Sequence, residues 1–132
     1  MACTEKRIVV KHHRVWLSAG WLLIALVVYL SLIPHPPEPL SFSNADKLEH
    51  GFAYGSLALW FCQIYVSTHS RMVTLAALIG LGVGLEFVQG WTGYRTFDVW
   101  DMVADSIGVL FGFLLVRTPL GRLFILIETA LR

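Results

Sequence analysis

Charged residues are scarce in this sequence, where they make up 14% of 132 residues. A typical soluble domain carries about 25%. The formal net charge is only +1, and no segment gathers enough basic residues for a nucleic-acid-binding surface. The two cysteines, Cys3 and Cys62, have neither the spacing of a metal-binding motif nor that of a disulfide framework. These absences exclude nucleic acid as a partner, and we expect no metal site and no cofactor.

Long hydrophobic runs take the place of the missing charges, because apolar residues make up 56% of the chain. The run 15–33 has 19 residues without a formal charge, enough to cross a hydrocarbon core about 30 Å thick as a helix. Three further runs, at about 45–67, 72–91 and 98–116, are long enough to do the same. We therefore predict an all-α integral membrane protein with four transmembrane helices in one domain, residues 1–132.

The segments that follow the apolar runs contain helix-breaking residues. Four prolines within 34–44 predict a stiff loop, and residues 92–97 predict a second, shorter loop on the same side of the membrane. Residues 119–132 are apolar with interspersed charges and too short to cross, which predicts a short amphipathic helix at the membrane interface. Pro119 and Gly121 favour a break before this helix, and its continuation from the fourth span is the alternative.

Basic residues are distributed unevenly between the two sides of this predicted topology. Only Lys47 and Arg95 lie on the side of the loops 34–44 and 92–97. The other eight lie on the side of the N-terminus: Lys6, Arg7, Lys11, Arg14, Arg71, Arg117, Arg122 and Arg132. Because Lys and Arg accumulate in cytoplasmic segments, we predict that residues 1–14 and 119–132 are cytoplasmic tails. The loops 34–44 and 92–97 are then outer loops.

Polar side chains gather at the outer ends of the last three predicted spans. On the second span Asp46, His50 and Tyr54 recur every four residues and so share one helical face, with Lys47 beside them. The preceding residues, from Ser43, resemble a capping box that would start this helix.

The third and fourth spans contribute further polar residues. Glu86 and Gln89 share a face near the end of the third span, and Arg95 lies in the loop that follows. Asp98, Asp101 and Asp105 share a face at the start of the fourth, where Asp98 is suited to cap the helix. We predict a joint polar site near the outer surface, with Arg95, Lys47 and His50 as partners of Glu86.

Each of these residues also has an interpretation that needs no function. Acidic residues at helix starts stabilise any helix by capping, by about 0.5–1 kcal/mol each, and Tyr54 is suited to the membrane interface. Glu86 and Asp105 are different, because carboxylates inside apolar spans are costly and need a protein, water or cation partner. Small residues predict close helix packing, namely Gly82, Ala104, Gly108 and Gly112.

Four motifs in this order resemble the VanZ-like family of small bacterial membrane proteins. They are Asp46-Lys47-x-x-His50-x-x-x-Tyr54, Glu86-x-x-Gln89, Arg95-x-x-Asp98-x-x-Asp101 and Gly108-x-x-x-Gly112. The resemblance covers roughly residues 31–112, and the family commonly has asparagine where this chain has Asp105. It implies a bacterial inner membrane and a link to low-level resistance to the glycopeptide teicoplanin, without implying a reaction.

Three functions remain open from the sequence. The first is a site for an anionic lipid-linked or cell-envelope ligand at the outer leaflet, attracted by Lys47, His50, Arg95 and two helix N-termini. The second is a membrane-embedded phosphoester hydrolase, with His50 as acid or base oriented by Asp46 and with carboxylates that hold a divalent cation. The third is a structural or proton-coupled transport subunit, in which the glycine stripes build a homo-oligomer.

Overall fold

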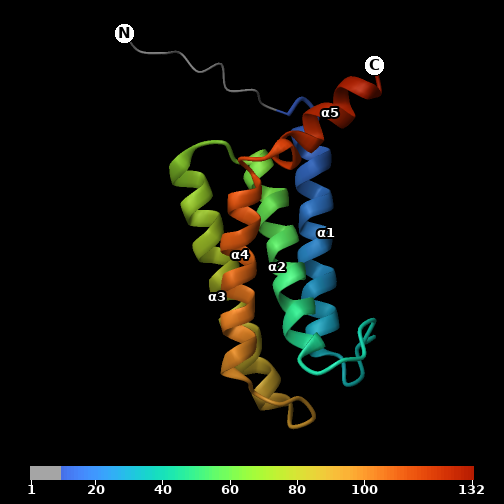
Figure 1. Cartoon of the computed structure of the whole chain (residues 1–132), viewed down its shortest axis with the longest axis vertical. Helices are drawn as coiled ribbons and strands as arrows, with labels where there is room; N and C mark the ends of the chain where they lie inside the picture. Colours follow the sequence, from blue (N-terminus) through green and yellow to red (C-terminus); the bar gives the residue numbers. More distant parts are fainter. Residues whose placement is uncertain (1–9) are drawn as a thin grey trace.

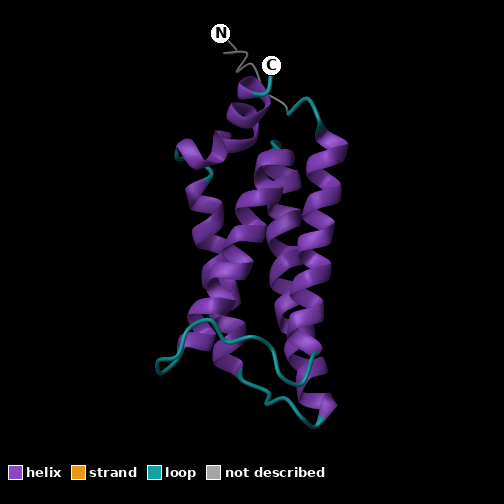
Figure 2. Ribbon diagram, turned by 90° about the vertical axis from the view of Figure 1, so that its right-hand side faces the viewer, coloured by secondary structure: helices purple, strands orange, loops and turns teal. Residues whose placement is uncertain are grey.

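The computed structural model describes residues 10–132, and within this range the chain is helical without strands (Figures 1 and 2). The long helices are α1 (His13–Leu32), α2 (Ala45–Ile64), α3 (Thr68–Thr92) and α4 (Val99–Leu115). A 3-10 helix, η1 (Pro119–Arg122), and the short α5 (Leu123–Ala130) follow. The all-helical prediction is therefore confirmed. The first nine residues of the predicted tail 1–14 lie outside the described residues.

The four long helices run side by side along the long axis of the molecule (Figure 1). The loops after α1 and after α3 lie at one end, which we call the loop end (Figure 2). The start of α1 and all of α5 lie at the opposite end, which we call the terminal end. The predicted site residues therefore belong to the loop end, and the chain's basic C-terminal segment belongs to the terminal end.

Two helices, α1 and α3, are long and apolar enough by themselves to cross a membrane, with mean hydropathies of 2.1 and 1.8. A third candidate span combines α4 with the following η1–α5 segment, which bends away from it by 73°. By the same measure α2 is not apolar enough to be a candidate span, because Asp46, Lys47 and Glu49 lie in its first turns. The residues described thus give two to three candidate spans.

The closest helix packing joins α2 to α4 through small residues on both. A Cβ on Gly108 would overlap the backbone of Gly51, and a Cβ on Gly112 would overlap that of Gly55. A Cβ on Gly55 would lie 2.9 Å from the carbonyl oxygen of Gly108. The predicted packing stripe on α4 is therefore occupied by α2 of the same chain, and it is not free to build a homo-oligomer.

The helix α2 begins at Ala45, where the predicted span begins, but its cap differs from the prediction, while the cap of α4 agrees with it. No capping box forms at Ser43, because the N-cap is Asn44 in a left-handed conformation (φ 62°) without a side-chain bond to the helix. The α4 helix is capped as predicted, since the Asp98 carboxylate accepts a hydrogen bond from Trp100 N at 2.8 Å. A short polar residue that tolerates positive φ competes well with serine at such a turn.

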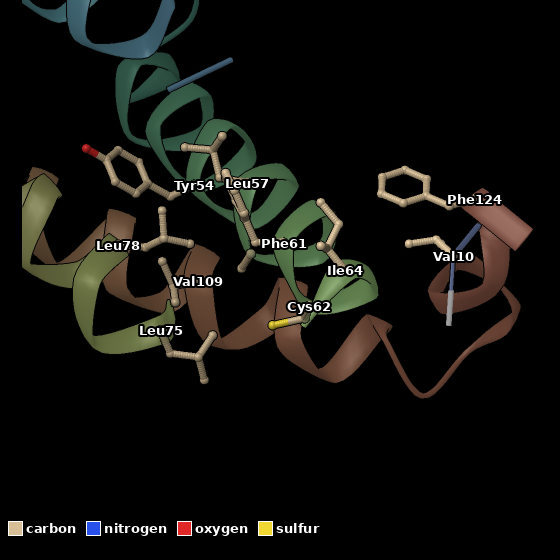
Figure 3. Close-up of a cluster of buried hydrophobic side chains, with 11 residues drawn as sticks. Val10, Tyr54, Leu57, Phe61, Cys62, Ile64, Leu75, Leu78, Val109 and Phe124 are labelled. Atoms are coloured by element: carbon tan, nitrogen blue, oxygen red, sulfur yellow. The ribbon is translucent and has the colours of Figure 1, made fainter. Parts of the chain in front are cut away.

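The C-terminal segment folds back over the terminal end of the bundle. Phe124 stacks on Trp16 of α1 with ring centroids 4.0 Å apart, and Glu128 accepts hydrogen bonds from Lys11 N, His12 N and Trp16 Nε1. In the close-up of the core, Phe124 and Val10 lie at one end of the buried cluster and Tyr54 at the other (Figure 3). The chain bends by 73° between α4 and this segment, so the predicted break is confirmed and the alternative, continuation of α4, is wrong. At the bend Gly121 lies so close to the Val116 backbone that a Cβ would overlap it.

Candidate functional site

Lys47 is the centre of an ion-pair network at the loop end. Its ammonium nitrogen lies 2.8 Å from Asp98 Oδ2, 3.1 Å from Asp101 Oδ1 and 3.1 Å from Asp46 Oδ2. The sequence explains the geometry, because Lys47 is in the first turn of α2 while Asp98 and Asp101 open α4, which packs beside it. Two helices whose adjoining N-termini carry acids are held together here by one cation.

Asp98 has the environment of a carboxylate that stays ionised. The Lys47 ammonium lies 2.8 Å from Asp98 Oδ2, and Trp100 N donates a hydrogen bond to Asp98 Oδ1; both contacts favour the charged carboxylate. Capping and ion pairing therefore use the same carboxylate. The α4 N-terminus is already neutralised by a group of its own chain and is not free for an external anion.

His50 lies one turn further along α2 and contacts two carboxylates of α4. Its Nδ1 is 3.0 Å from Asp105 Oδ1, and its Nε2 is 3.9 Å from Asp101 Oδ2. The Asp105 side chain is almost fully buried, with 3% of it exposed. Gly82 of α3 makes room for it, because a Cβ there would lie 2.7 Å from Asp105 Oδ2. The sequence prediction that Asp46 orients His50 is therefore wrong: Asp46 binds Lys47, and Asp105 has that position.

Glu86 finds its partner in the backbone. Its Oε1 accepts a hydrogen bond from Asp98 N, and only 1% of the residue is exposed. This contact ties the end of α3 to the start of α4. The predicted ion pair between Glu86 and Arg95 does not form among residues 10–132, because the turn after α3 brings Asp98 N to the carboxylate instead.

Arg95 lines a cavity of about 630 Å³ beside α2 at the loop end. Val27, Leu30 and Ala53 give it an apolar wall, and the polar side chains at its lining include His50, Tyr54, Asp46, Glu38 and Glu49. No salt bridge of Arg95 is formed within the described part of the chain. Of the two basic residues of the predicted site, Lys47 is paired with carboxylates, and Arg95 forms no ion pair in the described residues. The Tyr54 hydroxyl points away from the other labelled core side chains (Figure 3).

Gln89 lies apart from the carboxylates, although its sequence motif placed it with Glu86. Its amide donates a 2.9 Å hydrogen bond to Ser31 O at the end of α1. Tyr94 adds a second tie nearby, from its hydroxyl to Leu32 O at 2.6 Å. Both contacts fix the loop end of α1, which forms the apolar wall of the cavity. Gln89 is therefore a positioning residue for that wall.

Several structural partners were not identified from the sequence. Gly51 and Gly55 form the second half of the α2–α4 contact, and their spacing of four was the available signal. Glu128 and Trp16 have no sequence signal, because 112 positions separate them. Within residues 10–132 no group of three or more His, Cys, Asp or Glu side chains is arranged to hold a metal ion.

Comparisons with known proteins agree with the resemblance carried by the motifs. The family model described as VanZ/LLP1 matches residues 40–125, which contain the whole Lys47 network. The uncharacterized protein C11E3.10 of Schizosaccharomyces pombe is 35% identical over 97 residues, which cover 71% of this chain and 57% of that protein. No solved structure matches. Since the family model covers more than half of the sequence, the chain belongs to the VanZ/LLP1 family.

Proposed function

We propose that this VanZ/LLP1 family member is a four-span membrane protein that binds the anionic headgroup of a lipid or lipid-linked ligand at its loop end. The observation that carries the proposal is the cavity lined by Arg95, a cation without an ion pair in residues 10–132, next to an apolar wall. A lipid-like ligand has both parts, a charged headgroup and an apolar chain. Ligand sites are commonly concave, mostly apolar and equipped with a few oriented polar groups.

Packing supports the proposal of four crossings even for the two helices that are less apolar. The charged turns of α2 and α4 face each other in the Lys47 network, so their ionic groups meet protein partners instead of lipid. The Gly51 and Gly108 contact brings the two backbones together, as in many membrane helix pairs. With the loop end outside, the basic residues of the terminal end would lie on the cytoplasmic side.

Electrostatics favours Arg95 over Lys47 as the anion-binding residue. Three carboxylates surround the Lys47 ammonium, and a ligand phosphate would have to displace one of them. Arg95 needs no such displacement, and its planar guanidinium can bind two phosphate oxygens at once. His50 lines the same cavity and adds a second polar contact.

A binding assay on the purified full-length protein tests the proposal. Nanodiscs of phosphatidylcholine with and without phosphatidylglycerol would be compared by native mass spectrometry of the retained lipid. We expect preferential retention of phosphatidylglycerol, and a loss of at least tenfold in that preference for Arg95→Ala. Arg117→Ala removes the same charge at the terminal end and should change nothing. Equal retention of both lipids, or no effect of Arg95→Ala, would refute the proposal.

The family resemblance extends the proposal to a bacterial inner membrane and to teicoplanin. The similar protein named above comes from a yeast, so this similarity does not favour a bacterial location over a eukaryotic one. Expression in a teicoplanin-sensitive bacterium gives a direct measurement. A raised minimal inhibitory concentration that is lost with Arg95→Ala supports the link, and an unchanged concentration removes it.

A further inference from the structure

We propose that the loop-end cavity is also a reaction site, in which His50 acts as a general base in the hydrolysis of a phosphate ester of the bound ligand. The inference rests on the ligand site proposed above and adds a chemical step to it. It differs from the sequence hypothesis of a hydrolase in its residues, since Asp105, not Asp46, positions the imidazole.

The buried Asp105 determines which nitrogen of His50 is available. An ionised carboxylate only accepts hydrogen bonds, so the 3.0 Å contact with Asp105 places the imidazole proton on Nδ1. In the neutral imidazole, which the reaction requires, the other nitrogen, Nε2, is then an acceptor. A carboxylate that fixes the tautomer and orientation of a histidine is the arrangement found where histidine takes protons during catalysis.

His50 Nε2 is the atom that would accept a proton from the attacking molecule. This nitrogen makes no hydrogen bond within residues 10–132, and Asp101 Oδ2 lies 3.9 Å away, too far for a direct bond. A water molecule that donates to both atoms fits between groups at this distance. His50 belongs to the cavity lining, so such a water would face the ligand.

Arg95 and Tyr54 line the same cavity and supply the other requirements of the reaction. The Arg95 guanidinium would bind the phosphate oxygens and offset the charge that builds up on them. The Tyr54 hydroxyl adds a neutral donor to the residues that line the cavity. Arg95 thus binds the group that His50 would help to attack.

The proposed step conserves atoms and charge. His50 Nε2 takes one proton from water, and the water oxygen forms a bond to phosphorus while the phosphorus–oxygen bond to the leaving alcohol breaks. The alkoxide takes a proton from solvent at the cavity mouth, and His50 returns its proton to solvent. One water is consumed for each phosphate and alcohol released, and Asp105 neither gains nor loses a proton in the step.

The pH dependence of the reaction would reflect every group packed around the imidazole. From α2 these are Asp46, Lys47 and Tyr54, from α3 Glu86, and from α4 and the preceding cap Asp98, Asp101 and Asp105. Arg95, Glu38 and Glu49 line the same cavity as the imidazole. Of these, only Asp105 contacts the imidazole within hydrogen-bond distance.

The test measures turnover and binding on the same full-length preparation. Nanodiscs that contain phosphatidylglycerol or phosphatidic acid would be followed by ³¹P NMR for release of glycerol phosphate or inorganic phosphate. We expect turnover by the native protein and a loss of about 100-fold or more with His50→Gln, while lipid retention falls by much less because Arg95 still binds the headgroup. His69→Gln, an exposed histidine at the start of α3, is the matched control and should keep full activity.

Asp105→Asn tests the positioning role separately. It keeps the shape and an acceptor for His50 Nδ1 but removes the charge, so the pH–rate profile should change while thermal stability changes little. His69→Gln should leave that profile unaltered. Absence of phosphate release from both lipids, with phosphatidylglycerol still retained, overturns this inference and leaves the ligand site standing. If Arg95→Ala alters neither retention nor turnover, both proposals fail.

Discussion

At the scale of single residues, the chain uses almost every charge of its loop end for an internal contact. Lys47 forms ion pairs with three carboxylates. Asp105 lies within hydrogen-bond distance of His50, and Glu86 accepts a hydrogen bond from the backbone nitrogen of Asp98. A charge with such partners can lie close to a membrane at a moderate cost in free energy. Arg95 stands out because it has no ion-pair partner in the described residues and lines a cavity.

Removing the Lys47 ammonium should be more damaging than removing one of its acids. Lys47→Met leaves Asp98 and Asp101 facing each other, and we expect a loss of about 1–2 kcal/mol in the free energy of unfolding, with solvent screening included. Asp46→Asn removes only an exposed pair and should change it by about 0–1 kcal/mol. Thermal unfolding in detergent measures both. Equal midpoints for the two variants would contradict the central role of Lys47.

At the scale of the helix, the contact between α2 and α4 decides where the polar groups meet. Glycines at 51 and 55 face glycines at 108 and 112, and this close approach brings the first turns of both helices within ion-pair distance. The sequence showed the stripe on α4 and suggested an oligomer contact. The intramolecular partner could not be recognised, because a stripe of small residues indicates close packing without naming what packs on it.

Gly108→Ala should therefore destabilise the fold by about 1–3 kcal/mol, since the added Cβ would overlap the Gly51 backbone. Gly80→Ala on α3 is the matched control, because nothing lies within 4 Å of its Cβ position. An alanine there should be neutral or stabilise the helix by about 0.5–1 kcal/mol. Thermal unfolding checks both variants. A stable, monomeric Gly108→Ala protein would show that the two helices are less closely packed.

At the scale of the whole molecule, the C-terminal segment closes the terminal end of the bundle. Glu128 of α5 accepts three hydrogen bonds from the start of α1. Burial acts to raise the pKa of Glu128, but the donors His12 N, Lys11 N and Trp16 Nε1 outweigh it and lower the pKa to about 2. The contact is therefore maintained at every physiological pH.

The lowered pKa gives a prediction with a defined sign. A carboxylate with a folded-state pKa of about 2 and an ordinary value of 4.5 contributes stability above pH 4.5. This contribution is lost as the pH falls from 4.5 towards 2. Glu128→Gln should lower the unfolding midpoint at pH 7, and the difference from the native protein should narrow below pH 4.5. A difference that is constant from pH 7 to pH 3 would contradict this assignment.

The proposed four crossings predict which loops are reached from each side. In a Cys3→Ser, Cys62→Ala background, single cysteines would be introduced by Glu38→Cys, Thr96→Cys, His69→Cys and Arg117→Cys. A membrane-impermeant maleimide should label positions 38 and 96 from outside, and positions 69 and 117 only after permeabilisation. Labelling of 38 and 69 from the same side would exclude a crossing by α2 and contradict the four-span topology.

The sequence by itself determined the helical class, the order and approximate bounds of the long helices, and the polar composition of the loop end. These follow from local properties, namely hydrophobic run length, proline and glycine positions and charge spacing. Asp98 as the cap of α4 was predictable for the same reason, because its partner is two residues away. Asn44 as the cap of α2 was not predicted, since a single left-handed residue took the place of the serine cap.

Only the tertiary structure decided which groups became partners. His50 is 55 positions from Asp105 and only 4 from Asp46, yet it contacts Asp105. Lys47 binds Asp98, which is 51 positions away in the sequence. Glu86 binds the backbone nitrogen of Asp98 and not a basic side chain, and Arg95 lines the cavity. Which side chains pair depends on how α2 is rotated and shifted along its axis relative to α4. The backbone contacts between the glycines of the two helices fix this rotation and shift. Spacing along the chain places side chains on a face of a helix, but only packing determines what that face meets.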